Sequence, residues 1–163
     1  MFKNLFKKNQ GVQIHSPVSG KIIPLEEVPD PVFAEKMMGE GIAIMPAESV
    51  LVAPFDGEIV QIPETKHAIG MRDKGGNEVL IHIGLETVEL KGEGFTPKVQ
   101  SGEQVTLGQP LIEIDLEYLR ENAPHIITPI VVTNSAGSGK SYQFTDEKEA
   151  KAEETVLLTI YNQ

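Results

Sequence analysis

The sequence predicts an all-β protein in which two copies of a strand-turn-strand unit share one core. Three observations support this prediction. The chain has 15 Gly and 11 Pro, which are spread along it as punctuation between short apolar runs. Those runs are rich in β-branched residues, which favour strands. Finally, a segment near the beginning of the chain recurs 37 residues later, as Pro17 and Pro54 illustrate.

The apolar runs between turn residues predict the strands in order along the chain. They are Val12–His15, Gly20–Pro24, Gly41–Met45, Ser49–Ala53, Gly57–Ile62, Glu78–Ile83, Leu111–Ile114, Ile126–Val132 and Val156–Tyr161. Only two segments favour short helices. One is Asp30–Gly39, with Asp as N-cap, Pro in the first turn and Gly as the stop, and the other is Asp115–Asn122, followed by Pro124.

The internal repeat is the strongest long-range signal. Ser16–Ile22 aligns with Ala53–Ile59, with Pro, Gly and Ile at equal places. With a slip of one residue, 39–45 then aligns with 77–83, which pairs Ile44 with His82. Two copies are too few for a solenoid, so we predict a pseudo-twofold sandwich.

Composition excludes several classes of protein. The 163 residues fit one domain, for which we expect residues 12–163, after a flexible basic segment at 1–11. No apolar stretch is long enough for a membrane helix, and no cysteine is present, so we expect a soluble cytoplasmic monomer. With 24 acidic against 14 basic side chains the net charge is −10, which argues against nucleic acid and for a partner with a basic face.

The first eight residues differ from the rest of the chain. Lys3, Lys7 and Lys8 accompany Phe2, Leu5 and Phe6, whose spacing of three and four gives a minimal amphipathic turn. This pattern is typical of weak association with an anionic membrane surface, and the alternative is a frayed terminus.

Two of the four histidines are candidates for chemistry. His82 lies in an apolar strand, where burial favours a neutral, nucleophilic ring. His67 precedes it by 15 residues across a polar turn, the length of a hairpin, so antiparallel pairing would bring the two rings together. For His15 and His125 we expect structural roles.

Two neighbouring imidazoles without a thiol suit two kinds of chemistry. One ring can attack a phosphoryl group while the other stabilises the transferred oxygens. The pair could instead bind zinc, which needs a third ligand, from Asp73 or from another protein. A zinc hydrolase is therefore one alternative, and a lipoyl- or biotinyl-like carrier domain modified at Lys66 is another. The Gly137–Ser141 segment lacks the first glycine of a nucleotide-binding loop.

Several longer motifs occur together in this chain. Asp30–Lys36, Thr65–Ala68 and His82–Phe95 resemble, in this order, the glucose-family IIA proteins of the phosphoenolpyruvate-dependent sugar phosphotransferase system. The resemblance spans about residues 12–163. It implies an antiparallel β-sandwich of the duplicated hybrid, or barrel-sandwich, type and no required cofactor. It also implies a cytoplasmic phosphocarrier, working at the inner face of the membrane, that takes a phosphoryl group from HPr and passes it to a cysteine of a permease IIB domain.

The resemblance also assigns roles to individual residues. His82 corresponds to the phosphorylated histidine, bonded through Nε2, His67 to the residue that stabilises the phosphoryl group, and Thr65 to the support of His67. An apolar docking patch would comprise Val32, Phe33, Met37, Met38, Leu80 and Val88. Glu86 stands where the family usually has Asp, which keeps the carboxylate but moves it out by one methylene. Regulatory partners of the unphosphorylated form are a further implication. Apart from the resemblance, His67 and His82 could bind zinc at an interface with a partner protein.

Overall fold

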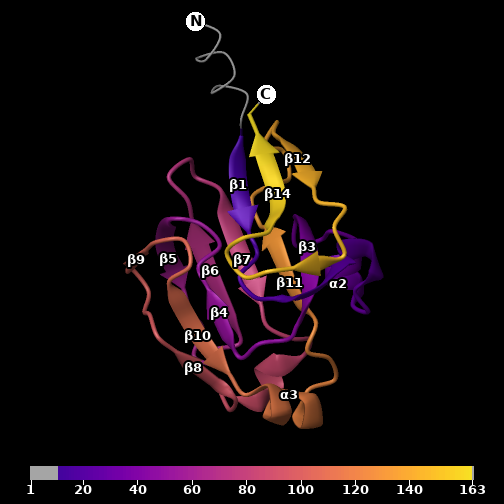
Figure 1. Ribbon diagram of the computed structural model, residues 1–163, viewed down its shortest axis with the longest axis vertical. Coiled ribbons are helices and arrows are strands. Elements are labelled where there is room, and N and C mark those ends of the chain that lie inside the picture. Colours follow the sequence, from indigo (N-terminus) through magenta and orange to yellow (C-terminus); the bar gives the residue numbers. More distant parts are fainter. Residues whose placement is uncertain (1–10, 163) are drawn as a thin grey trace, which may run out of the picture.

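Antiparallel strands in three sheets form the framework of the computed structural model, which describes residues 11–162 (Figure 1). The largest sheet has the order β13-β2-β3-β11-β7-β6-β5-β9, and the two smaller sheets have the orders β1-β14-β12 and β4-β10-β8. The strands are β1 Val12–His15, β2 Gly20–Pro24, β3 Glu40–Pro46, β4 Val50–Val52, β5 Gly57–Gln61, β6 Ala68–Arg72, β7 Glu78–His82, β8 Phe95–Pro97, β9 Gln104–Val105, β10 Pro110–Ile114, β11 Thr128–Val132, β12 Ser141–Phe144, β13 Glu149–Ala150 and β14 Val156–Tyr161. The predicted all-β architecture is confirmed.

Helical structure is confined to short segments. They are the 3-10 helices η1 Leu25–Glu27 and η2 Thr87–Leu90 and the α-helices α2 Pro31–Ala34 and α3 Leu116–Asn122. The predicted helix at 115–122 is present as α3, and Asp115 caps it, because its carboxylate accepts a hydrogen bond from Tyr118 N at 3.0 Å. The predicted helix over residues 30–39 is too long, since α2 ends where Lys36 adopts a left-handed φ of 60°.

The large sheet is pseudo-symmetric about its centre. Four strands in the order β13-β2-β3-β11 meet their counterparts β9-β5-β6-β7, and the halves join where Ile130 of β11 pairs with Ile81 of β7. The same pseudo-twofold relation appears in two backbone hydrogen bonds. The donors of these two bonds are 37 residues apart in the sequence, and so are their acceptors. His15 N donates to Pro54 O at 2.9 Å, and Val52 N donates to Pro17 O at 2.8 Å. The duplication inferred from the sequence is therefore present.

The predicted continuation of the repeat with a one-residue slip is wrong. In the sheet, β3 corresponds to β6, and β7 corresponds to β11. Ile44 faces the main core, whereas His82 faces the other side of the sheet, so the two positions are not equivalent. The counterpart of His82 is Val131, one residue beyond the central Ile130–Ile81 pair.

Two apolar clusters lie on opposite faces of the large sheet. The main core contains Ile42, Ile81 and Phe55, with most of the fully buried side chains. The second cluster includes Leu25 of η1, Phe33 of α2 and Val131 of β11. Figure 1 shows α2 next to β3. The connection formed by residues 25–39 thus covers part of the outer face of the sheet.

Five short strands escaped the sequence prediction, namely β6, β8, β9, β12 and β13. The predicted membrane-associating segment, residues 1–8, lies outside the described residues. Within residues 11–162, the helices are all too short or too polar to cross a membrane.

Candidate active site on the outer face of the large sheet

His82 ends strand β7 on the outer face of the large sheet. Side chains alternate along the strand, so Val79 and Ile81, which are 2% and 0% exposed, enter the main core. Leu80 and His82 point the other way and are half-buried. The imidazole therefore does not occupy a core position. It lies beside the second apolar cluster at the surface.

His67 is brought to His82 by the β6–β7 hairpin. Ala68 pairs with His82 in the ladder, and Ile83 N donates to the carbonyl of His67 at 2.7 Å. Because His67 precedes the regular strand, its side chain can turn toward His82. The ring centroids are 5.0 Å apart with an interplanar angle of 80°. The hairpin spacing in the sequence predicted this contact.

Each imidazole is held through its Nδ1 atom. Nδ1 of His82 lies 2.8 Å from the carbonyl of Gly84, which can only accept, so this nitrogen carries the proton. The Nε2 atom of neutral His82 is then left with a lone pair. Nδ1 of His67 lies 2.7 Å from the hydroxyl of Thr65, and either of these two atoms can donate. Thr65 and Gly84 thus orient the two rings.

Both rings are kept neutral by their surroundings. Burial lowers the pKa of His82, and this effect outweighs the hydrogen bond to Gly84 and the charge of Asp30, which act in the opposite direction. Burial also lowers the pKa of His67, and a charge on His82 would lower it further. Each ring thus loses its proton more readily than a free histidine. Neutral imidazole, unlike imidazolium, has the lone pair that a nucleophile requires.

The proposed apolar patch divides into exposed and buried residues. Met37, Val88 and Val32 are 71%, 46% and 40% exposed. Leu80 and Met38 are partly buried against the second cluster. Phe33 is 5% exposed, and its ring centroid lies 5.1 Å from that of His82, so it forms a wall of the site and not an open docking surface.

Acidic residues lie on both segments that border His82. Glu86 is exposed and adopts a left-handed φ of 57° at the start of η2, and its carboxylate makes no hydrogen bond to the described residues. Asp30 caps α2 through Val32 N, and its charge raises the pKa of His82. Sequence reasoning identified Asp30 only as a cap. Its proximity to His82 depends on the folding of α2 over the sheet.

The residues described here do not complete a metal site. No group of three His, Asp, Glu or Cys side chains within residues 11–162 is arranged to hold an ion. The expectation that Asp73 could be the third ligand is wrong, because both of its carboxylate oxygens accept hydrogen bonds from Asn77. His67 precedes β6 and Asp73 follows it, so the two residues lie at opposite ends of the strand. A resident zinc ion therefore does not fit.

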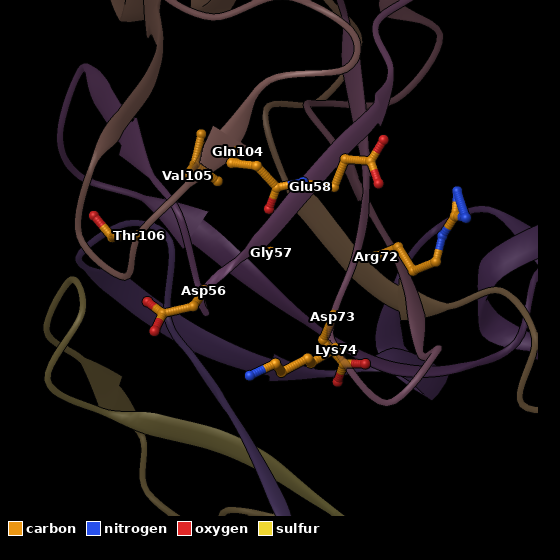
Figure 2. A pocket seen from close by; sticks show the side chains of 9 residues that line it. All are labelled: Asp56, Gly57, Glu58, Arg72, Asp73, Lys74, Gln104, Val105 and Thr106. Atoms are coloured by element: carbon orange, nitrogen blue, oxygen red, sulfur yellow. The ribbon is translucent and has the colours of Figure 1, made fainter.

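A cavity of about 510 Å³ lies at the Asp73 end of β6. Figure 2 shows Gln104 and Thr106 on one side of it, and Arg72, Asp73 and Lys74 on the other. Its lining mixes both signs of charge and includes neither His67 nor His82. The histidine pair is thus separate from this cavity and lies on a surface that a partner protein could cover.

Residues 12–137 match the family model described as phosphoenolpyruvate-dependent sugar phosphotransferase system, EIIA 1. Three curated relatives carry the name PTS system glucose-specific EIIA component. The one from Halalkalibacterium halodurans is 47% identical, over 98% of both chains. The one from Bacillus cereus is 54% identical over 83% of this chain and 84% of its own length, and the one from Staphylococcus epidermidis is 48% identical over 98% of both.

A solved structure shares the fold. The glucose permease IIA from Mycoplasma capricolum superposes with a TM-score of 0.86 at 39% sequence identity. The superposition covers 92% of this chain and 96% of the other. Fold and sequence thus point to the same group of proteins.

Proposed function

Because this chain belongs to the EIIA 1 family of the phosphoenolpyruvate-dependent sugar phosphotransferase system, we propose that His82 is the residue that carries the phosphoryl group. The protein is a phosphotransfer component of sugar uptake, and membership of this family implies interaction with HPr and with a permease IIB domain. The observation that carries the assignment is the hydrogen bond from His82 Nδ1 to Gly84, because it leaves Nε2 free to react.

The proposed step begins with attack of the His82 Nε2 lone pair on the phosphorus of phosphohistidine in HPr. A new N–P bond forms, the N–P bond of the donor breaks, and its electron pair returns to the donor imidazole. The proton on Nδ1 of His82 stays there throughout, hydrogen-bonded to the carbonyl of Gly84. In the next step a cysteine thiolate of the IIB domain attacks the same phosphorus, and Nε2 leaves with the electron pair.

His67 has a supporting role in this proposal. Its ring centroid lies 5.0 Å from that of His82, so His67 is a neighbour that could donate a nitrogen-bound proton to an oxygen of a phosphoryl group on His82. Such transfer depends mainly on position and on stabilisation of charge. Thr65 holds the His67 ring in place for this contact. The step uses no metal, and zinc at the pair would need a third ligand from a partner protein.

The surface around the pair suits reversible docking of proteins. Exposed Met37, Val32 and Val88 supply adaptable apolar contacts, and Asp30 and Glu86 supply negative charge toward a basic partner. A phosphoryl group adds about −1.5 to −2 charge at pH 7, so partners of the bare surface would be repelled after phosphorylation. We propose that this difference in charge between the phosphorylated and bare surfaces underlies regulatory binding. We place this binding at the cytoplasmic face of the membrane. Glucose is the proposed sugar, since relatives about half identical are named for it.

The test is phosphorylation by phosphoenolpyruvate and the purified upstream carriers, followed by transfer to a panel of IIB domains. His82→Gln should take no label, whereas His67→Gln should accept label at His82 but pass it on slowly. His15→Gln, a histidine on β1, is the matched control and should behave as wild type. Labelling of His82→Gln, with mass analysis under alkaline conditions to retain phosphohistidine, would overturn the assignment.

A further inference from the structure

The segment between His82 and Thr87 is a tight loop that lies between β7 and η2. Gly84 has a φ of 77° and Glu86 a φ of 57°, so the backbone turns twice in the left-handed region within three residues. The carbonyl that holds His82 belongs to this loop. The position of the reactive ring therefore depends on what fixes the loop.

One contact fixes the direction of the Gly84 carbonyl. The peptide unit between Gly84 and Leu85 is planar and trans, so its C=O and N–H point in opposite directions. Leu85 N donates to the carbonyl of His125 at 3.0 Å. The Gly84 carbonyl must then point away from His125, which is the direction in which it meets His82 Nδ1.

A second contact fixes the preceding peptide. The hydroxyl of Thr87 donates to the carbonyl of Ile83 at 2.6 Å, and Thr87 is 0% exposed. A threonine bonded to the carbonyl four residues earlier is ordinary inside a helix. Here the intervening residues Gly84 and Glu86 are left-handed, so the bond closes a loop and not a helical turn.

The methyl group of Thr87 also contacts the loop. A Cβ atom added to Gly84 would lie 2.6 Å from Cγ2 of Thr87, so the methyl packs directly against Gly84. Ile83 N is in turn tied to the carbonyl of His67. The Thr87 side chain thus braces the carbonyl of Ile83, the residue whose N–H joins the end of β7 to the backbone of His67.

We propose that Thr87 is a positioning residue for phosphoryl transfer, because its hydroxyl fixes the loop that holds His82 with the proton on Nδ1 and the lone pair on Nε2. This inference rests on the proposed role of His82. Without the hydroxyl, the Ile83 carbonyl loses its partner, and the bond from Leu85 N to His125 is left to hold the Gly84 carbonyl without the support of the preceding peptide. The ring of His82 can then exchange to the tautomer with the proton on Nε2, which cannot attack phosphorus.

The experiment compares Thr87→Val, which keeps the shape but lacks the hydroxyl, with Thr87→Ser, which keeps the hydroxyl. The matched control is Ser16→Ala, since Ser16 is also 0% exposed and its hydroxyl donates to the carbonyl of Val18 at 2.7 Å, far along the chain. Nitrogen-15 NMR of the imidazoles reports the tautomer of His82 without any phosphoryl donor. Rapid-quench labelling with phospho-HPr reports the transfer rate.

Thr87→Val should raise the population of the Nε2–H tautomer and slow phosphoryl transfer by about tenfold, the lower end of the loss found when partners that orient metal-ligating histidines are removed. Thr87→Ser and Ser16→Ala should keep the wild-type tautomer and rate. Equal tautomers and rates in Thr87→Val and wild type would overturn the proposal, and so would a shift in Ser16→Ala as large as in Thr87→Val.

If Thr87→Val does not fold, the wild-type NMR spectrum still tests the inference, because a His82 ring protonated mainly on Nε2 contradicts it. The outcomes are separate from those for the proposed function. A wild-type protein that takes no label at His82 refutes the function, whereas the dependence of the tautomer on Thr87 is measured independently.

Discussion

Replacing Phe33 by alanine separates the two effects of this ring, on stability and on the histidine beside it. Phe33 is 5% exposed and packs in the cluster beneath η1 and α2. Removing a buried phenyl ring typically costs about 3–5 kcal/mol of unfolding free energy. In a protein of this size we expect a fall of about 6–20 °C in the unfolding temperature. Differential scanning calorimetry measures this change.

The same substitution should raise the pKa of His82 toward the ordinary value of 6.5. Burial is the main cause of its lowered pKa, and the Phe33 ring, with its centroid 5.1 Å away, is part of what excludes water. The assay is an NMR titration of the imidazole protons. The control is Phe55→Ala, because Phe55 is also 5% exposed but lies in the main core.

Phe55→Ala should cost similar stability and leave the pKa of His82 unchanged. If both variants raise this pKa equally, loss of stability and not local hydration is responsible, and the reasoning fails. An unchanged or lower pKa in Phe33→Ala would also refute it.

Three further predictions concern individual residues of the site. His82→Gln should flatten the pH dependence of the free energy of unfolding, measured in urea. In the wild type, between the lowered pKa of His82 and about 6.5, only the unfolded chain binds a proton at His82, so stability falls on acidification. An unchanged dependence of stability on pH in His82→Gln would contradict this. Gly84→Ala should destabilise by more than about 1 kcal/mol in urea unfolding, because an added Cβ meets atoms at 2.6 Å, whereas the control Gly76→Ala, with no atom within 4 Å, should cost less. Thr65→Val should lose a hydrogen bond worth about 0.5–1.5 kcal/mol and slow delivery to a IIB domain, with labelling of His82 retained; equal delivery rates would show that Thr65 does not support His67.

The sequence predicted the contacts that depend on strand periodicity and spacing. His82 was identified from its apolar strand, and His67 from a hairpin length, because both signals are local. The strands of the first repeat were predicted for the same reason, since Pro17 and Gly20 recur at Pro54 and Gly57. These local signals predict the structure well because side chains alternate between the two faces of a strand.

The sequence failed where geometry depends on several segments at once. The repeat was misaligned beyond Ile59 because β6, a short strand with Gly70 at its centre, was not recognised. The Gly84 carbonyl could not be assigned to His82, since its direction depends on a left-handed turn. Asp30 was identified only as a cap, because its effect on His82 requires the position of α2 in the fold.

The site arises where the two halves of the duplicated fold differ. In the first half, the connection of residues 25–39 places η1 and α2 over the sheet, and Val131 beneath them is 0% exposed. In the second half, the shorter connection of residues 62–67 leaves the equivalent His82 half-buried and supplies His67 at its end. A phosphoryl carrier needs both conditions at one atom, because burial keeps the ring neutral and exposure lets a partner reach it. The two half-sheets are equivalent, but their connections differ in length. The long connection, residues 25–39, supplies Phe33 as a wall that buries one side of His82, and the short connection, residues 62–67, leaves the other side open to a partner.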